Sequence, residues 1–496
     1  MTLLKRIETI GNRLPDPAML FLIALGIVMI CSQLAVSMQW TVSSPYTEVL
    51  TANSLLSSAG IWWLLSHMVE NFILFPPLGI VLVGMLGIGL AERSGLMSAL
   101  LQFIIRRTPA SLLTPVTILL GIMSSLGLDA GYVVLPPVAA ALYLAAGRSP
   151  LTGIAAVFAG ISAGFSANLL ITALDPLLSG FTQTAAQIIA PDYQVAVTAN
   201  WWFMIASTFV LTLTAWAVTA VYVDPVLQQY TITATTNNRT ETGHDMEIAG
   251  LKVAGLTFII AITIVLFMIY VPKAPLFGEG NRFARWIEVT VPLLFLVFLL
   301  PGIAYGYCVG SVKNNRDVAR MMGESMAALG PYIVLAFFAA QFIEAFKYSG
   351  LGEMLAISGG QFLAGIALPS TLLLSSFVLM VIMVNLLIGS ASAKYAFIAP
   401  VFVPMLMQVG FSPELTQAAY RVGDSVSNVV TPLNPYMIII VIQVQKYLNN
   451  SGIGTVVSMM LPYFIAFSLV WSALLVLWFL CGIPLGPEGP LHFNFT

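Results

Sequence analysis

Residues 367–407, ALPSTLLLSSFVLMVIMVNLLIGSASAKYAFIAPVFVPMLM, decide the fold of this chain. Two apolar arms flank a centre of small and polar residues, GSASAK at residues 389–394, with no soluble loop between them. A helix is weakened across such a centre, and backbone N–H and C=O groups freed at membrane depth are tolerated only where they face protein or a wet cavity. The stretch therefore predicts a helical hairpin that enters the membrane and turns back, over about residues 367–408.

A second stretch repeats this pattern in the first half of the chain. Residues 112–145 are apolar except around SSLGLDAG at residues 124–131, and they predict another re-entrant hairpin over about residues 111–147. Paired interruptions at matching positions in two halves are the best sequence signal for the binding site of a transporter.

The composition indicates that most of the chain lies within a lipid bilayer. Of 496 residues, 59% are hydrophobic and 8% are charged, whereas soluble domains carry about 25% charged residues. A helix needs roughly 20 apolar residues to cross a bilayer. We therefore predict an all-α polytopic membrane protein with about nine transmembrane helices plus the two re-entrant hairpins. The predicted spans are residues 17–38, 76–90, 151–178, 201–221, 253–271, 289–307, 331–346, 416–444 and 456–480.

The positive charges orient these helices. With the amino terminus inside, 13 of the 19 Lys and Arg residues lie on the cytoplasmic side, four lie outside, and Lys394 and Arg421 lie within the membrane. This bias follows the positive-inside rule, and the loop from Lys273 to Arg285 is the one segment that departs from it. A net charge of −2 without a basic patch argues against nucleic acid as a partner.

The two halves also resemble each other beyond their hairpins. PLGIV at residues 77–81 resembles GPYIV at residues 330–334, and each half has a long helix that dissolves into polar residues before a proline. These polar runs are GFSAN at residues 164–168 and GDSVSN at residues 423–428. The first hairpin opens from the cytoplasm and the second from outside, so we predict an inverted repeat. Its halves are residues 1–222 and 251–496, joined by a cytoplasmic linker at residues 223–250.

Five ionisable side chains fall within the predicted membrane segments: Asp129, Asp175, Lys394, Arg421 and Asp424. An ionised group in hydrocarbon costs several kcal/mol, so each of these needs a partner or a wet cavity. Arg421 and Asp424 lie three residues apart and can share one helix face. There they either form an ion pair, or Arg421 holds a substrate carboxylate with two hydrogen bonds.

The residues that follow Asp424 also suit a small cation. Asp424, Ser425, Asn428 and Thr431 offer the oxygen ligands that hard cations such as Na⁺ prefer, and freed carbonyls would complete the shell. The carboxylate suits a proton equally well, because burial favours its neutral form. The three histidines lie away from the interrupted helices, which argues against an intramembrane enzyme.

Several runs of sequence carry a family resemblance. NLLIGSASAKY at residues 385–395, APVFVPM at residues 399–405, AYRVGDS at residues 419–425 and GNRLPDP at residues 11–17 resemble the p-aminobenzoyl-glutamate transporter (AbgT) family. The resemblance covers essentially the whole chain. It implies nine membrane helices and two re-entrant hairpins in a bowl-shaped homodimer of the bacterial inner membrane.

The same resemblance implies roles for individual residues. Asp175 corresponds to a functionally important aspartate, and Tyr395 stands where an aromatic side chain, usually Trp, faces the substrate. Asn168 and Asn428 resemble the paired ion sites of related hairpin transporters. The implied residues for substrate binding or coupling are Asp175, Asn385, Ser390, Ser392, Tyr395, Pro413, Arg421 and Asp424. The candidate Na⁺ ligands are Asn168, Asp424, Ser425, Asn428 and Thr431.

The resemblance implies a secondary active transporter of p-aminobenzoyl-glutamate and related folate-catabolite or aryl-amide anions, coupled to Na⁺ or H⁺ and using no other cofactor. It also implies export of sulfonamide antimetabolites, whose aniline ring mimics the p-aminobenzoyl ring. Two alternatives stay open: a carboxylate or ion antiporter of the wider group of hairpin transporters, and a channel, since broken helices also build pores. The expected partners are an anionic small molecule, membrane lipid and a second copy of the chain.

Overall fold

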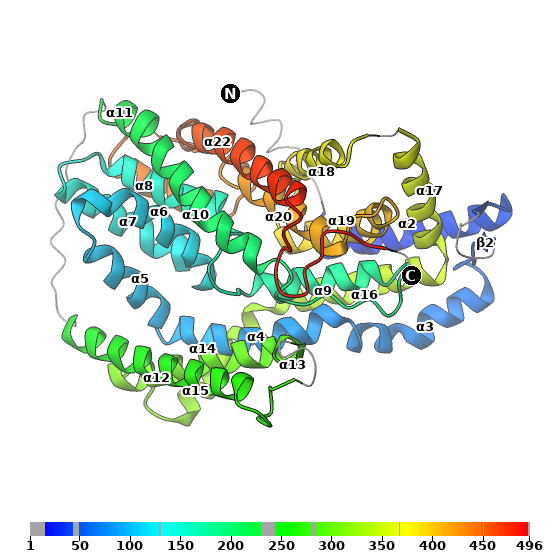
Figure 1. Ribbon diagram of the computed structural model, residues 1–496, viewed down its shortest axis with the longest axis horizontal. Coiled ribbons are helices and arrows are strands. Elements are labelled where there is room, and N and C mark those ends of the chain that lie inside the picture. Colours follow the sequence, from blue (N-terminus) through cyan, green and yellow to red (C-terminus); the bar gives the residue numbers. More distant parts are fainter. Residues whose placement is uncertain are drawn as a thin grey trace.

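The computed structural model describes residues 15–42, 49–127, 130–229, 244–278, 284–366, 368–449 and 451–494, which fold mostly into helices (Figure 1). The first half contains α2 (Pro17–Ser37), α3 (Ser58–Ile73), α4 (Pro76–Arg93), α5 (Leu96–Arg106), η1 (Ala110–Leu112), α6 (Leu113–Met123), η2 (Ser124–Gly127), α7 (Ala130–Ala145), α8 (Pro150–Phe158), η3 (Ala159–Ala163), α9 (Leu174–Ala186), α10 (Trp201–Val218), η4 (Thr219–Val223) and α11 (Asp224–Leu227). The second half contains α12 (His244–Tyr270), α13 (Ala284–Glu288), α14 (Thr290–Val309), α15 (Asn315–Ala328), α16 (Gly330–Tyr348), α17 (Leu351–Ile366), α18 (Ser370–Asn385), α19 (Ala391–Met407), α20 (Pro413–Ser427), α21 (Met437–Gln445) and α22 (Ile453–Leu480). Strands β1 (Thr41–Val42) and β2 (Leu50–Thr51) pair antiparallel, with Thr41 opposite Thr51 and Val42 opposite Leu50.

The membrane-spanning character of the chain is confirmed. Among the described residues, six helical segments are long and apolar enough to cross a membrane, or up to eight if each of two bent helix pairs counts as one span. The sequence predicts nine spans. Two of these, residues 151–178 and 416–444, are predicted to dissolve into polar residues before a proline, and both are broken in the structure. The first becomes α8 and η3 followed by α9, and the second becomes α20 followed by α21.

Both predicted hairpins are present as interrupted helix pairs. In the second, α18 ends at Asn385 and α19 begins at Ala391, and the Ser390 hydroxyl caps α19 by accepting a hydrogen bond from the Ala393 N–H at 3.4 Å. In the first, η2 ends at Gly127 before α7 begins. Asp129, which the sequence places in this interruption, lies outside the described residues.

The sequence patterns do not predict helix α3. Its apolar run is interrupted by His67, Glu70 and Asn71, and these polar residues lower its hydropathy, so the pattern does not indicate a membrane helix. The structure pairs α3 with α16: Gln341 Nε2 donates to the Met68 carbonyl at 2.8 Å, and Gln341 Oε1 accepts from Asn71 Nδ2 at 3.2 Å. Hydrogen bonds between helices thus satisfy polar groups that a lone helix in lipid would leave exposed.

Helices α9, α19 and α20 lie in the middle of the molecule, with α10 and α22 above them and α12, α14 and α15 below (Figure 1). All residues of α20 are buried, although the helix carries ionisable groups. Glycines allow this close packing. At Gly423 a Cβ atom would lie 2.7 Å from the Val378 carbonyl oxygen of α18, and at Gly160 it would lie 2.4 Å from the Ile118 carbonyl oxygen of α6.

Candidate functional site

The candidate site is built where two buried helices are interrupted. After η3, residues 164–173 run without regular helix to α9, and after α20, residues 428–436 form turns before α21. Asparagines hold these irregular segments: Asn168 Oδ1 accepts from the Leu170 N–H, and Asn434 Oδ1 accepts from the Tyr436 N–H, both at 3.0 Å. An Asn side chain stabilises a turn when it bonds to the backbone two residues further on.

One buried ion pair joins the two halves of the chain. Arg421 Nη2 of α20 donates to Asp175 Oδ1 of α9 at 2.6 Å, and Arg421 is only 1% exposed. The other carboxylate oxygen, Asp175 Oδ2, accepts from the Thr172 N–H at 2.6 Å and the Thr172 hydroxyl at 2.9 Å. Charge-assisted hydrogen bonds of this kind are stronger than neutral ones.

A second buried ion pair joins the second hairpin to α20. Lys394 Nζ lies 2.6 Å from Asp424 Oδ1, and both residues are 1% exposed. Lys394 Nζ also donates to Asn385 Oδ1 and to the Ile388 carbonyl. The suggestion from helical spacing that Arg421 pairs with Asp424 is therefore wrong for this structure: each of the two has a partner from another element.

Asn385 forms hydrogen bonds with several polar groups at the end of α20. Its Nδ2 donates to the Asp424 carbonyl at 2.8 Å, to Ser427 Oγ at 2.8 Å and to Asn428 Oδ1 at 2.9 Å. Ser425 Oγ instead accepts from the Ser166 N–H at 3.1 Å, which links α20 to the interrupted segment of the first half. Two predicted site residues, Asn385 and Asn428, are thus in direct contact.

One carboxylate oxygen among the candidate Na⁺ ligands differs from the others in its hydrogen bonding. Within the described part of the chain, Asp424 Oδ2 is buried without a hydrogen-bond partner. Such an acceptor costs about 1–3 kcal/mol, and a bound proton or Na⁺ would remove this cost. Asn168 Nδ2 donates to Ser125 Oγ at 2.9 Å, while Thr431 Oγ1 accepts from the Leu433 N–H at 3.4 Å.

A cavity of about 360 Å³ lies beside the ion pairs and is lined by both halves of the chain. Thr172 lines it and donates to Asp175, and Asn428 lines it and contacts Asn385. The other polar or aromatic residues along its wall are Ser125, Tyr132, Phe165, Tyr332, Ser390, Ser392, Asn434 and Tyr436.

The predicted site residues divide into those that line the cavity and those that support its wall. Ser390, Ser392 and Asn428 belong to the lining. The supporting group, which does not contribute to the lining, comprises Asn168, Asp175, Asn385, Tyr395, Arg421, Asp424, Ser425 and Thr431, and Pro413 belongs to neither group. In this structure the Arg421 guanidinium therefore points to Asp175 rather than to a ligand in the cavity.

Tyr395 belongs to a buried polar chain behind the cavity wall. Its hydroxyl lies 2.6 Å from Thr182 Oγ1, which also donates to Gln417 Oε1 at 2.7 Å. Its ring lies against that of Tyr420, whose hydroxyl contacts Asp424 Oδ1 at 3.2 Å. The expectation from the resemblance that the side chain at position 395 faces the substrate therefore does not describe this conformation.

Pro413 acts at the start of α20, away from the cavity. It follows the helix cap Ser412, whose Oγ accepts from the Leu415 N–H at 3.0 Å, and its fixed φ suits the first turn of a helix.

The sequence reasoning missed two features of the site. The sequence predicts that Lys394 is an intramembrane charge, but its pairing with Asp424 has no signal in local spacing. The stacked rings of Tyr132 and Tyr436, 4.1 Å apart, form part of the cavity wall. The polar run that ends in Asn434 and Pro435 could have pointed to Tyr436.

Comparison with known proteins identifies the group to which the chain belongs. A model of the AbgT putative transporter family matches residues 2–493. The chain belongs to the AbgT family. The AbgT resemblance seen in the sequence runs is thereby confirmed over nearly the whole chain, and this protein is a multi-pass membrane transporter.

Three relatives of this AbgT protein extend the comparison. The p-aminobenzoyl-glutamate transport protein of Escherichia coli (strain K12) is 33% identical, with 97% of this chain and 95% of the relative aligned. The crystal structure of the Alcanivorax borkumensis YdaH transporter, described as having an unusual topology, matches with a TM-score of 0.92 and 41% identity over 95% of this chain and 100% of the other. The structure of Neisseria gonorrhoeae MtrF, described as illuminating a class of antimetabolite efflux pumps, matches with a TM-score of 0.89 and 40% identity over 98% of this chain and 100% of the other.

Proposed function

We propose that this AbgT-family protein is a secondary active transporter, not an enzyme, that moves p-aminobenzoyl-glutamate and related folate-catabolite or aryl-amide anions in the bacterial inner membrane. Transport is coupled to Na⁺ or H⁺ and extends to export of sulfonamide antimetabolites. The observation that carries the proposal is the cavity of about 360 Å³ lined by both interrupted halves, a size within the usual range for small ligands. Its relatives named for p-aminobenzoyl-glutamate transport and antimetabolite efflux support this substrate class.

The lining suits an anionic aromatic ligand. Ser390 and Ser392 stand at the amino end of α19, a helix of 17 residues, and free N–H groups at a helix start favour an anion. The stacked Tyr132 and Tyr436 offer a face for an aryl ring. In this proposal, a ligand carboxylate binds at the start of α19 and the aryl ring lies against the tyrosines.

The coupling ion acts at Asp424. Its Oδ1 is held by Lys394, while its Oδ2 is buried without a partner in the described residues. A proton or Na⁺ on this carboxylate weakens the attraction to Lys394, because it removes or offsets the negative charge. Since Lys394 lies on α19 beside the proposed anion position, ion binding and ligand binding act on the same helix.

Transport by purified full-length protein in proteoliposomes tests this function. Radiolabelled p-aminobenzoyl-glutamate is followed while the Na⁺ and pH gradients are varied independently. We expect saturable transport that depends on one of the two gradients. Saturable transport that does not depend on either gradient would contradict the coupling. A flux that rises linearly with substrate concentration and does not saturate would indicate a channel.

The proposed orientation places the amino terminus and residues 223–250 in the cytoplasm. Single cysteines at Thr236 and Phe495, both outside the described residues, are to be introduced after the native cysteines are replaced by Ser. An impermeant thiol reagent is expected to reach Phe495→Cys from the periplasm and Thr236→Cys only after the membrane is opened. Labelling of both positions from the same side would refute this topology.

A further inference from the structure

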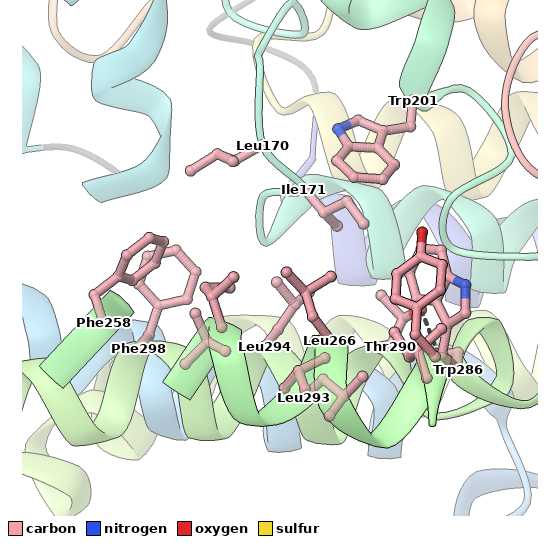
Figure 2. Close-up of a pocket in the computed structure, with 15 residues that line it drawn as sticks. Leu170, Ile171, Trp201, Phe258, Leu266, Trp286, Thr290, Leu293, Leu294 and Phe298 are labelled. Carbon is pink, nitrogen blue, oxygen red and sulfur yellow. Dashed lines mark hydrogen bonds between the residues drawn. The ribbon is translucent and has the colours of Figure 1, made fainter. Parts of the chain in front are cut away.

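A second cavity lies apart from the candidate site, between α12 and α14 on one side and the segment that precedes α9 on the other (Figure 2). Its volume is about 330 Å³, and its wall is almost entirely apolar. Leu266 of α12 and Leu293 and Leu294 of α14 face Leu170 and Ile171 across it. None of the predicted site residues lines this cavity.

The helices that form one wall of this cavity also present apolar side chains to the bilayer. Ile259 and Phe267 of α12 are 63% and 62% exposed, and Leu296 of α14 is 44% exposed. Both helices are long and apolar enough to cross the membrane. The cavity therefore lies at the depth of lipid hydrocarbon, where an acyl chain is the most abundant apolar occupant.

One end of the cavity is lined by Tyr270, Trp201 and Trp286, residue types that are enriched where membrane meets water. Trp201 Nε1 already donates to the Leu169 carbonyl at 3.0 Å. Trp286 Nε1 is buried and has no hydrogen-bond partner among the described residues. A buried indole N–H normally finds an acceptor, so Trp286 Nε1 can donate to an oxygen atom of a molecule bound in the cavity.

Two basic residues are close in the chain to residues that line this end of the cavity. Arg285 is exposed and precedes Trp286 in α13, and Lys273 follows Tyr270 closely in the chain. Both belong to the one loop that departs from the positive-inside bias. Glu288 is exposed on the same short helix and supplies an opposing charge. A phosphate group meets these features because it is an anion and carries the oxygen acceptors that Trp286 lacks.

We propose that this cavity binds one phospholipid of the surrounding membrane. One acyl chain lies between α14 and residues 170–171, and the phosphate accepts a hydrogen bond from Trp286 Nε1 beside Arg285. The lipid thereby joins α12 and α14 to the segment that leads into α9. This site is independent of the transported substrate, so the proposal stands or falls separately from the proposed function.

Native mass spectrometry of the full-length protein, delipidated in mild detergent and titrated with phosphatidylglycerol, tests the acyl-chain site. Val297→Phe places a phenyl group in the cavity, because Val297 lines it, whereas the control Leu296→Phe places a phenyl group on the lipid-facing side of α14. We expect one tightly bound phospholipid per chain in the wild type and in Leu296→Phe, and at least a tenfold weaker affinity in Val297→Phe. Equal affinity in all three proteins would overturn the proposal.

The phosphate contact is tested with variants that leave the apolar wall intact. Trp286→Phe keeps an aromatic ring but removes the N–H, so we expect at least about tenfold weaker binding of phosphatidylglycerol, the size of one hydrogen bond to a charged group. Arg285→Gln is expected to weaken phosphatidylglycerol binding but not diacylglycerol binding, and the control Glu288→Gln is expected not to weaken either.

Three further results would overturn the proposal. The first is equal binding of diacylglycerol and phosphatidylglycerol by the wild type, because the phosphate would then contribute nothing. The second is displacement of the lipid by p-aminobenzoyl-glutamate or a sulfonamide, which would assign the cavity to the transport path. The third is a changed oligomeric mass of Val297→Phe, which would assign the cavity to a second copy of the chain.

Discussion

Replacing Asp175 by Asn tests whether the ion pair with Arg421 holds the two halves of the chain together. Asparagine keeps the size of the side chain, and its carbonyl can still accept from the Thr172 N–H. The substitution removes the charge opposite Arg421, whose guanidinium is 1% exposed and stays buried. Arg421 Nε already lacks a partner among the described residues, so the variant leaves this cation without a counter-charge.

The expected loss follows from the geometry of the pair. At the observed 2.6 Å, an effective dielectric constant of about 20 corresponds to a gross attraction of about 6 kcal/mol. Desolvation of both groups opposes this attraction, and removal of one partner of a buried pair typically costs about 3–5 kcal/mol. We expect Asp175→Asn to lower the free energy of unfolding by that amount.

The assay is reversible unfolding of the purified protein in mixed micelles, with the free energy of unfolding as the readout. Glu344→Gln is the control, because Glu344 pairs with Lys347 at 2.9 Å but both side chains are partly exposed, at 31% and 23%. Such a pair contributes about 0–1 kcal/mol. The double variant Asp175→Leu/Arg421→Met removes both charges and is expected to be more stable than Asp175→Asn alone.

Two results would refute this reasoning. If Asp175→Asn costs no more than Glu344→Gln, the ion pair does not stabilise the fold. If the double variant is less stable than Asp175→Asn, the loss comes from the missing contacts of these side chains and not from an uncompensated charge. A double-mutant cycle separates the two contributions, because residues in direct contact are not additive.

Three further predictions concern the site and its packing. Asp424→Asn is expected to abolish ion-coupled transport in proteoliposomes while membrane insertion is retained, and full gradient-dependent transport would contradict it. Gly160→Ala is expected to destabilise the fold by about 1–3 kcal/mol, because its Cβ would clash with the Ile118 carbonyl oxygen, whereas Gly26→Ala meets nothing within 4 Å and serves as the control. Ser392→Ala is expected to weaken binding of p-aminobenzoyl-glutamate about fivefold in a direct binding measurement, because one hydrogen bond is lost. Unchanged affinity would place the ligand away from the start of α19.

The sequence alone predicted the interrupted helices with useful accuracy. The small and polar residues at 389–394 and 423–428 weaken an apolar helix in lipid, so local composition predicts an interruption near each run, although residues 391–394 and 423–427 remain helical. The breaks between α18 and α19 and after α20 lie at or beside these runs. Helix α3 is not predicted because polar residues interrupt its apolar run, and one of them, Asn71, donates to Gln341 of α16, a contact that local hydropathy does not record.

The sequence by itself predicted the interrupted apolar helices and four of the buried ionisable residues, Asp175, Lys394, Arg421 and Asp424, because both follow from the transfer of side chains and backbone into hydrocarbon. It did not predict helix α3 or the burial of Glu414. Only the tertiary structure decided which charges meet. Arg421 pairs with Asp175, 246 residues away, and not with Asp424 three residues along the same helix. Lys394 forms an ion pair with Asp424 because the second hairpin packs against α20. Helical spacing tells which side chains can meet on one helix, whereas the packing of distant segments determines which of them do.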